Sequence, residues 1–315
     1  MKGVPMRRSR DRHLLPRALA AAVALLLLGT GCSVKKFAIR KLGDALSEAG
    51  TTYASDDDPE LIRGALPFSL KLIESILAQS PDHRGLLLAA ASGFTQFSYA
   101  FVQEDADEAE DTNLEVAQAL RQRARKLYLR ARDYGLRGLE VDHPGFAGAL
   151  RQDAASAVKG ARPEDVPLLY WTAASWGSAI SLSKDDPDLL ADLPLVEALL
   201  RRAVELEEGY DYGALHEFLI TFQGSRSDTM GGSAEEARKH FDRAMELSGG
   251  HRASPLLALA ESVSVRNQDR AEFESLLKRA LAVDPDAKPE WRLANLVMQR
   301  RARWLLGRTD LLFAE

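Results

Sequence analysis

The chain has 315 residues, of which 46% are hydrophobic and 28% charged, and its formal net charge at pH 7 is −5. This length is enough for one large or two small domains with a substantial core. The acidic balance, without a basic stripe interleaved with aromatic residues, argues against a nucleic-acid-binding protein. Because Cys32 is the sole cysteine, an intramolecular disulfide and a cysteine metal cluster are both excluded.

The N-terminal segment has the pattern of an export signal. Residues 1–17 carry six basic residues and one acid, and residues 18–28 carry no charge. The uncharged run is too short to span a bilayer as a stable helix. It leads to Gly31-Cys32, and a small residue before a lone cysteine resembles a bacterial lipoprotein signal. In such proteins the cysteine is diacylated and becomes the first residue, so we predict a signal peptide over 1–31 and lipidation at Cys32.

The mature chain is then expected to be a single α-helical repeat domain over residues 32–315. Removing residues 1–31 takes away six bases and one acid, which moves the formal net charge from −5 to −10.

Ser33 follows the cysteine. In lipoproteins of Gram-negative bacteria, a residue other than Asp at this place points to the outer membrane. We therefore expect a periplasmic protein whose lipid anchor lies in the outer membrane.

Helical periodicity extends along most of the mature chain. Apolar residues recur at helical spacing over 34–46, and Asp58 followed by Pro59 indicates the start of the next helix. Further helices are predicted over 65–79, 86–102, 116–138, 146–158, 234–247, 255–265, 270–283 and 288–306. The central stretch 168–222 holds two amphipathic segments around a turn at Asp185-Asp186-Pro187. Because alternating β-branched runs are missing, the pattern predicts an all-α fold.

Five helix ends share Leu or Ala pairs followed by a turn. They lie at Leu77, Leu139, Val204, Met245 and Leu281, with steps of 62, 65, 41 and 36 residues. Small residues followed by a breaker resemble the second helix of tetratricopeptide repeats, whose period is about 34 residues. We predict a helical-hairpin solenoid of degenerate tetratricopeptide-like repeats, in which the two long steps hold insertions or an extra pair. A non-repetitive helical bundle is the alternative.

Two polar stretches interrupt the helical pattern. Residues 103–111 (QEDADEAED) hold six acids and no base. They lack the central Gly and alternating oxygen ligands of a calcium loop, so we predict a solvated acidic loop. Residues 223–233 are rich in Gly and Ser and form either a lid or a long connection. Ser233 with Glu236 three residues later predicts a capping box.

The candidate ligand site is an aromatic group in the central stretch. We hypothesise that one cleft is lined by Tyr170, Trp171, Trp176, Tyr212 and His216, because aromatic residues with a polar tip offer apolar area and a donor. Each residue taken alone is more typical of a helix-packing residue in an all-helical core.

Residue spacing refines the predicted cleft. Tyr212 and His216 are four apart and are expected to share a helix face. Trp171 and Trp176 are five apart, about 140° round a helix. The simplest arrangement places Trp176 opposite the Tyr212–His216 face and Trp171 deeper. An anionic solute would need a cation nearby, for which Arg226 is the candidate.

Patterns that carry catalysis are missing from the sequence. It contains no HExxH, GxSxG or Walker A motif, and its six histidines never pair at metal-ligand spacing. We therefore expect no enzyme, no cofactor and no metal site.

Several segments together resemble one family. They are SPDHRGLLLAAASGFTQFSYAF from Ser80, LLYWTAASWGSAIS, YDYGALHEFL and MGGSAEEARKHFDRAMEL, and with the lipoprotein start they resemble the T component of TRAP-transporter-associated proteins. The resemblance implies a periplasmic lipoprotein of degenerate tetratricopeptide-like repeats that forms a homotrimer. It also implies a partner, the solute-binding protein of a tripartite ATP-independent periplasmic transporter, and a cleft and pore for a hydrophobic or organic-acid ligand. The alternative is a general envelope scaffold lipoprotein, which would have less need to gather Tyr and Trp around one concavity.

Overall fold

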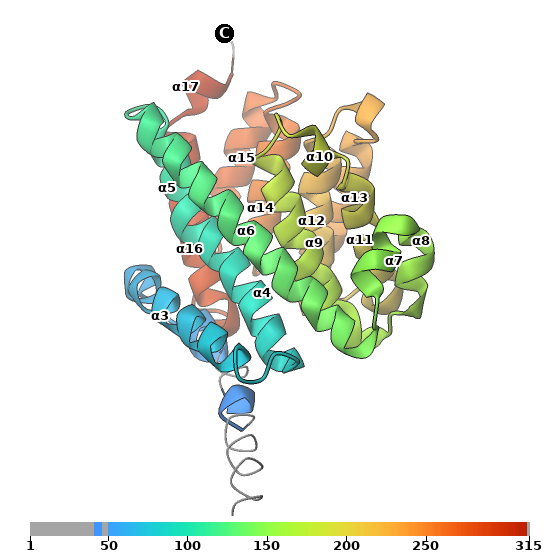
Figure 1. The fold of residues 1–315 in the computed structure, drawn as a ribbon. Helices are drawn as coiled ribbons and strands as arrows, with labels where there is room; N and C mark the ends of the chain where they lie inside the picture. Colours follow the sequence, from blue (N-terminus) through green and yellow to red (C-terminus); the bar gives the residue numbers. More distant parts are fainter. Residues whose placement is uncertain (1–40, 46–49, 314–315) are drawn as a thin grey trace, which may run out of the picture.

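The computed structural model describes residues 41–45 and 50–313, and within these ranges it contains helices and no strand. The predicted all-α class is therefore confirmed (Figure 1). Residues 41–45 are helical. The predicted signal peptide, Cys32 and most of the helix expected over 34–46 lie outside the described residues.

The N-terminal part of the chain supplies the first helices that surround the core. Its helices are α2 (Gly50–Ala54), α3 (Pro59–Leu77), α4 (Arg84–Ser98), the π-helical turn η2 (Tyr99–Gln103) and α5 (Glu104–Ala109). Asp58 accepts hydrogen bonds from the Glu60 and Leu61 amides, as its capping position predicts. The continuous helix Arg84–Ala109 is long and apolar enough to cross a membrane, but more than half of its apolar window is buried inside the protein. It packs against α3, α6 and α9.

The middle of the chain contains the longest helix. The elements are α6 (Leu114–Asp142), α7 (Phe146–Gln152), α8 (Ala154–Ala157), the short turns Val158–Gly160 and Pro163–Asp165, α9 (Val166–Ser181), α10 (Pro187–Leu190), α11 (Leu193–Glu207), η5 (Tyr210–Gly213) and α12 (Ala214–Gly224). Helix α6 approaches α9 closely because its Gly135 has no side chain. A Cβ there would lie 2.1 Å from the Thr172 hydroxyl oxygen. Small residues thus set the distance between these two central helices.

The C-terminal part forms a second core. Its elements are the turn Asp228–Met230, α13 (Ala234–Leu247), α14 (Ser254–Leu259), the π-helical turn η7 (Ala260–Ser264), α15 (Arg270–Leu281), η8 (Pro289–Trp291), α16 (Arg292–Leu306) and α17 (Thr309–Leu312). One apolar cluster runs from Ile62 on α3 to Phe222 on α12, and the other from Ile220 to Phe313. Both clusters include residues of α12, which joins the two halves.

Helix α16 returns to the start of the fold and pairs with the acidic segment (Figure 1). Arg300 lies 2.8 Å from Glu108, Arg301 lies 3.1 Å from Asp107, and Arg308 pairs with Asp111. The prediction of a solvated acidic loop over 103–111 is wrong, because residues 104–109 are helical. Arg300 and Arg301 lie some 190 residues further along the chain. Arg63 on α3 and Arg121 on α6 also pair with the segment, at Asp105 and Glu110.

Candidate functional site

Aromatic side chains gather around Arg252, where the beginnings of α9, α12, α14 and α16 lie. We call this group the aromatic cluster; it consists of Tyr170, Trp171, Tyr210, Tyr212 and Trp291. The ring centre of Tyr170 lies 4.9 Å from that of Trp171 and 5.5 Å from that of Tyr210. The Tyr212 and Trp291 rings are 5.0 Å apart, and the Arg252 guanidinium lies 5.8 Å from the Trp291 ring. Three of the five predicted site residues thus belong to this cluster.

A strained turn presents Tyr212. Asp211 and Tyr212 have φ values of +41° and +53° and are followed by Gly213 at +101°. Left-handed backbone is unfavourable for Asp and Tyr, and such strain persists only where the surroundings hold it. Here Arg252 donates a 2.8 Å hydrogen bond to the Asp211 carbonyl.

The turn leaves the Tyr212 side chain 54% exposed and outside helix α12. The prediction that Tyr212 and His216 share one helix face is therefore wrong.

Two carboxylates balance the central cation. Arg252 lies 3.3 Å from an Asp211 carboxylate oxygen and 3.4 Å from Glu217. Burial lowers the pKa of Arg252, but these carboxylates outweigh it and the pKa is raised. Burial also raises the pKa of Tyr170 well above its usual range, so its hydroxyl remains neutral and able to donate. The cluster offers apolar walls and a few polar groups, as small-molecule sites do.

Arg226, the cation expected from the sequence, is engaged elsewhere. Its Nε donates to the Phe222 carbonyl at 2.8 Å and one Nη donates to the Gly231 carbonyl at 3.2 Å. Arg226 therefore ties the 223–233 connection back onto α12. Ser233 caps α13 by accepting from the Glu236 amide at 3.1 Å, which is one half of the predicted capping box. The other half does not form, because the Ser233 amide donates to the Gln223 carbonyl at 3.0 Å.

Trp176 lies in a different environment. Its side chain is 1% exposed, and its Nε1 donates to Asp192 at 3.1 Å. The guanidiniums of Arg132 and Arg151 lie 5.0 and 5.7 Å from its ring. The expected order of depth is wrong, since Trp171 is partly exposed and Trp176 is buried.

His216 pairs with a second histidine. Its Nδ1 lies 2.9 Å from Nδ1 of His240, and its Nε2 lies 3.2 Å from Glu208. Burial lowers the pKa of both histidines. The pair joins α12 to α13 across 24 residues of sequence, which spacing along one helix cannot reveal. Within the described ranges, no group of three or more His, Cys, Asp and Glu side chains is arranged to hold a metal.

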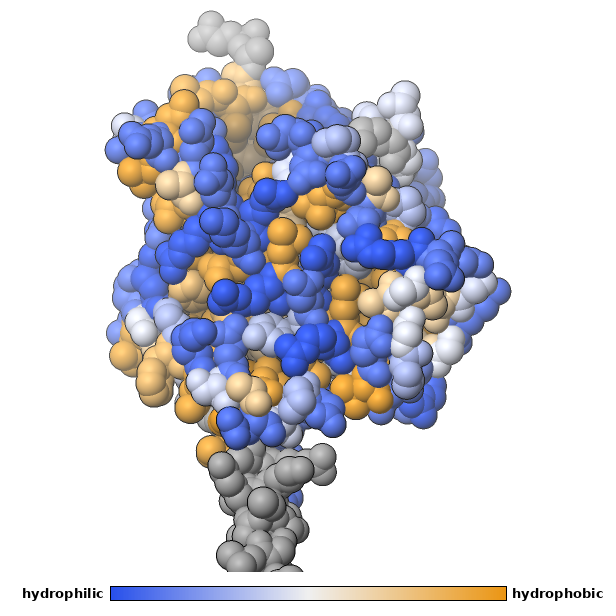
Figure 2. Space-filling view, viewed as in Figure 1, coloured by the Kyte–Doolittle hydropathy of each residue, from blue (hydrophilic) through white to orange (hydrophobic). Residues whose placement is uncertain are grey.

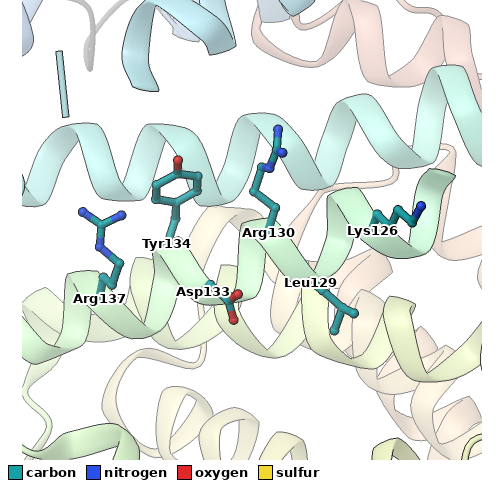
Figure 3. Close-up of a pocket in the computed structure, with 6 residues that line it drawn as sticks. All are labelled: Lys126, Leu129, Arg130, Asp133, Tyr134 and Arg137. Carbon is teal, nitrogen blue, oxygen red and sulfur yellow. The ribbon is translucent and has the colours of Figure 1, made fainter. Parts of the chain in front are cut away.

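A shallow groove of about 390 Å³ lies on the outer face of α6 (Figure 3). It is lined by Lys126, Leu129, Arg130, Asp133, Tyr134 and Arg137. A second groove of about 550 Å³ follows α15 from Ala271 to Ala282. Neither groove includes a residue of the predicted cleft. The α6 groove could have been found from the recurrence of basic residues at helical spacing in a chain that is acidic as a whole.

Comparison with known proteins identifies the family. The family model described as TRAP transporter T-component matches residues 55–313. The chain belongs to this family. It is also similar to an uncharacterised protein of Treponema pallidum (strain Nichols), with 31% identity over 312 residues that cover 93% of this chain and 97% of the relative. As a T-component, the chain is a transporter accessory rather than a member of an enzyme family, and the family is compatible with a location in the cell envelope.

Proposed function

We propose that this T-component is a lipid-anchored periplasmic protein that binds the solute-binding protein of its TRAP transporter. The observation that carries this proposal is the family match over 55–313. The N-terminal basic segment, the short apolar run and Cys32 support export and a lipid anchor. Ser33 supports placement in the outer membrane. The accessory would thus lie in the periplasm, where the solute-binding protein binds its ligand.

We propose that the protomer is a solenoid of helix pairs. The predicted repeat ends belong to α3, α6, α11, α13 and α15. As second helices of pairs, α6, α11, α13 and α15 pack on the preceding α4, α9, α12 and α14 respectively. Side-chain hydrogen bonds in the C-terminal half join residues at similar offsets: 34 for Arg238–Glu272, 40 for Arg301–Glu261 and 41 for Arg252–Asp211. A recurring offset of about one repeat is the signature of stacked pairs. Helices α7 and α8 account for part of the long step between α6 and α11.

A similar offset of about 40 residues separates residues in and around the aromatic cluster. Tyr170, Tyr210, Arg252 and Trp291 follow one another by 40, 42 and 39 residues. In the proposed solenoid they would occupy corresponding ends of successive helix pairs, and stacking of the pairs would build the cluster. We propose that it holds a small organic or hydrophobic ligand, with Tyr170, Trp171 and Tyr212 as binding residues. A ligand-binding role for Trp176 and His216 stays a prediction, which substitution of each residue tests.

We infer a homotrimer from the family resemblance. Exposed apolar side chains on α3 support a protein contact there, because Leu61 and Phe68 are 60% and 73% exposed and lie seven residues apart on one side of the helix. The competing function is an envelope scaffold, which would bind envelope proteins but no small ligand.

Native purification separates these functions. The tagged chain would be isolated from membranes of its own bacterium in mild detergent, and the bound proteins and small molecules identified by mass spectrometry. We expect the solute-binding protein and a small organic molecule that is lost in a Tyr170→Ala/Tyr212→Ala variant. Recovery of unrelated envelope proteins without the solute-binding protein would support the scaffold and reject the accessory role.

A further inference from the structure

Four basic residues follow one side of α6. They are Arg123, Lys126, Arg130 and Arg137, and we call them the α6 basic face. At about 100° per residue, they lie within an arc of about 60° round the helix. In Figure 3 Arg130 and Arg137 project from α6 to the same side as Tyr134, and Lys126 extends along the helix. At about 1.5 Å per residue, the four Cα positions extend over about 21 Å.

This positive charge is not cancelled within the protomer. In the part of the chain that the structure describes, no carboxylate lies within ion-pair distance of Arg123, Lys126 or Arg137. Arg130 has a distant partner, Glu74, at 3.6 Å. The mature chain has a formal net charge of −10 by the sequence count, so a face of this sign is unexpected.

The two acids next to the groove have partners outside the α6 basic face. Asp133 in the groove lies 2.7 Å from Arg132. Glu74 at its edge pairs with Lys71 and accepts a 2.8 Å hydrogen bond from the Tyr134 hydroxyl. Burial works to raise the pKa of Glu74, but the bonds from Lys71 and Tyr134 outweigh it and the pKa is lowered. Among the described residues, three cations of the face are therefore left without a paired acid, and Arg130 shares Glu74 with Lys71.

Aromatic rings hold three of the guanidiniums in place. The guanidinium carbon Cζ lies 5.8 Å from the ring centre for Arg123 over Phe97, 5.4 Å for Arg130 over Phe94 and 5.2 Å for Arg137 over Tyr134. The Phe94 and Tyr134 rings are themselves stacked at 6.0 Å. Cation–π contacts of this kind restrict the side chains before a partner arrives, so less conformational entropy is lost on binding.

We propose that the α6 basic face docks an acidic surface of a protein partner. The inference rests on the proposed function, in which that partner is the solute-binding protein. The length of about 21 Å and the open groove suit a row of carboxylates on a folded surface better than one small anion. Tyr134 and Leu129 supply apolar contact between the charges, as in protein interfaces. Figure 2 shows the same mixture of hydrophilic and apolar residues on the side of the molecule that carries α6.

The test compares charge reversals on two helices. Lys126→Glu/Arg137→Glu alters the α6 basic face, and Lys278→Glu/Arg279→Glu alters the groove on α15. Both pairs change the net charge equally. Binding of the full-length protein in detergent to the solute-binding protein of its own transporter would be titrated at two salt concentrations. We expect the α6 variant to bind roughly tenfold more weakly and with a smaller salt dependence, while the α15 variant binds as the wild type does.

A milder variant keeps the test valid if the double reversal disturbs folding. Arg137 donates to the Pro81 carbonyl at 3.1 Å, a bond that its replacement removes. The side chain of Lys126 is exposed, so Lys126→Glu alone should retain the wild-type circular dichroism and still weaken binding about threefold. The single control is Arg279→Glu.

The possible outcomes distinguish failure of the docking inference from failure of the proposed function. If the wild type binds the solute-binding protein and the α6 variants bind equally well, the inference is overturned and the proposed function stands. If the wild type does not bind, both are rejected. Loss of binding to phosphatidylglycerol vesicles, with protein affinity unchanged, would assign the face to anionic lipid instead. A change only in the sedimentation of the chain alone would assign it to a second copy, and would also overturn the inference.

Discussion

Glu104 gives the sharpest prediction about stability. Its side chain is 2% exposed at the seam between α5 and α16, and neither carboxyl oxygen has a hydrogen-bond partner among the described residues. Burial raises the pKa of Glu104 from 4.5 to about 8, although Arg301 and Arg300 act against this. The native protein therefore keeps a proton at Glu104 that the unfolded chain releases above about pH 4.5. The substitution of interest is Glu104→Gln, which cannot ionise.

The sign and size of the effect follow from proton linkage. Between pH 4.5 and 8 the native state binds more protons at this position than the unfolded state, so the free energy of unfolding falls as pH rises. For the pKa values given, the wild type should lose about 3 kcal/mol relative to the Glu104→Gln variant between pH 5 and pH 8. The free energy of unfolding of the variant, relative to that of the wild type, should therefore rise as the pH increases.

Urea unfolding followed by circular dichroism measures this difference. The two proteins would be compared at pH 5 and pH 8, with the exposed Glu115→Gln on α6 as the control for replacing a carboxylate at the surface. A difference between Glu104→Gln and the wild type that is the same at both pH values would refute the reasoning, because Glu104 would then ionise as it does in the unfolded chain.

The remaining predictions concern packing, the anchor and the ligand. Ala280→Arg should cost several kcal/mol, because Ala280 is fully buried in the second core, and an unchanged melting temperature would contradict that packing. Cys32→Ala should leave the protein uncleaved or soluble, and a cleaved variant that still sediments with membranes would reject lipidation. Tyr212→Ala should lower the ligand content of the purified protein while leaving its circular dichroism intact, because Tyr212 is exposed. Trp176→Phe should lower the melting point by removing a hydrogen bond to Asp192 worth about 1–2 kcal/mol.

Local signals predicted the helices well. Asp58 and Ser233 cap the helices they precede, because a side-chain oxygen next to a helix start needs only its near neighbours. Apolar periodicity likewise predicted the all-α class, since each helix must bury one face. The tetratricopeptide-like arrangement stays a proposal, supported by the offsets of about 40 residues between contacting side chains.

Features that depend on distant partners were missed. Residues 103–111 read as a solvated loop because their arginine partners come from several elements, α3, α6, α16 and the residues after it, and most of these are far away in the sequence. The pairing of His216 with His240 was hidden for the same reason. The prediction placed Tyr212 on a helix face because it extended the 3.6-residue periodicity of α12 back through η5, which is not an α-helix. The glycines on either side of YDY, at 209 and 213, were the signal of a turn there.

The candidate site was predicted in part. Aromatic composition brought out Tyr170, Trp171 and Tyr212, which the structure gathers around Arg252. Arg252 and Trp291 were not found from the sequence, because they lie far from Tyr170 along the chain, just before α14 and α16, and approach the cluster only in the folded protein. Their regular spacing from Tyr170 and Tyr210 is visible once the offset of about 40 residues is known.

Direct titration of the purified full-length chain with the solute-binding protein of its own transporter tests the central claim. Isothermal titration calorimetry would be run with an unrelated periplasmic binding protein of similar net charge as the control. The accessory role predicts saturable binding to the cognate protein and none to the control. Equal binding of both proteins, or the absence of saturable binding to the cognate protein at low salt, would contradict it.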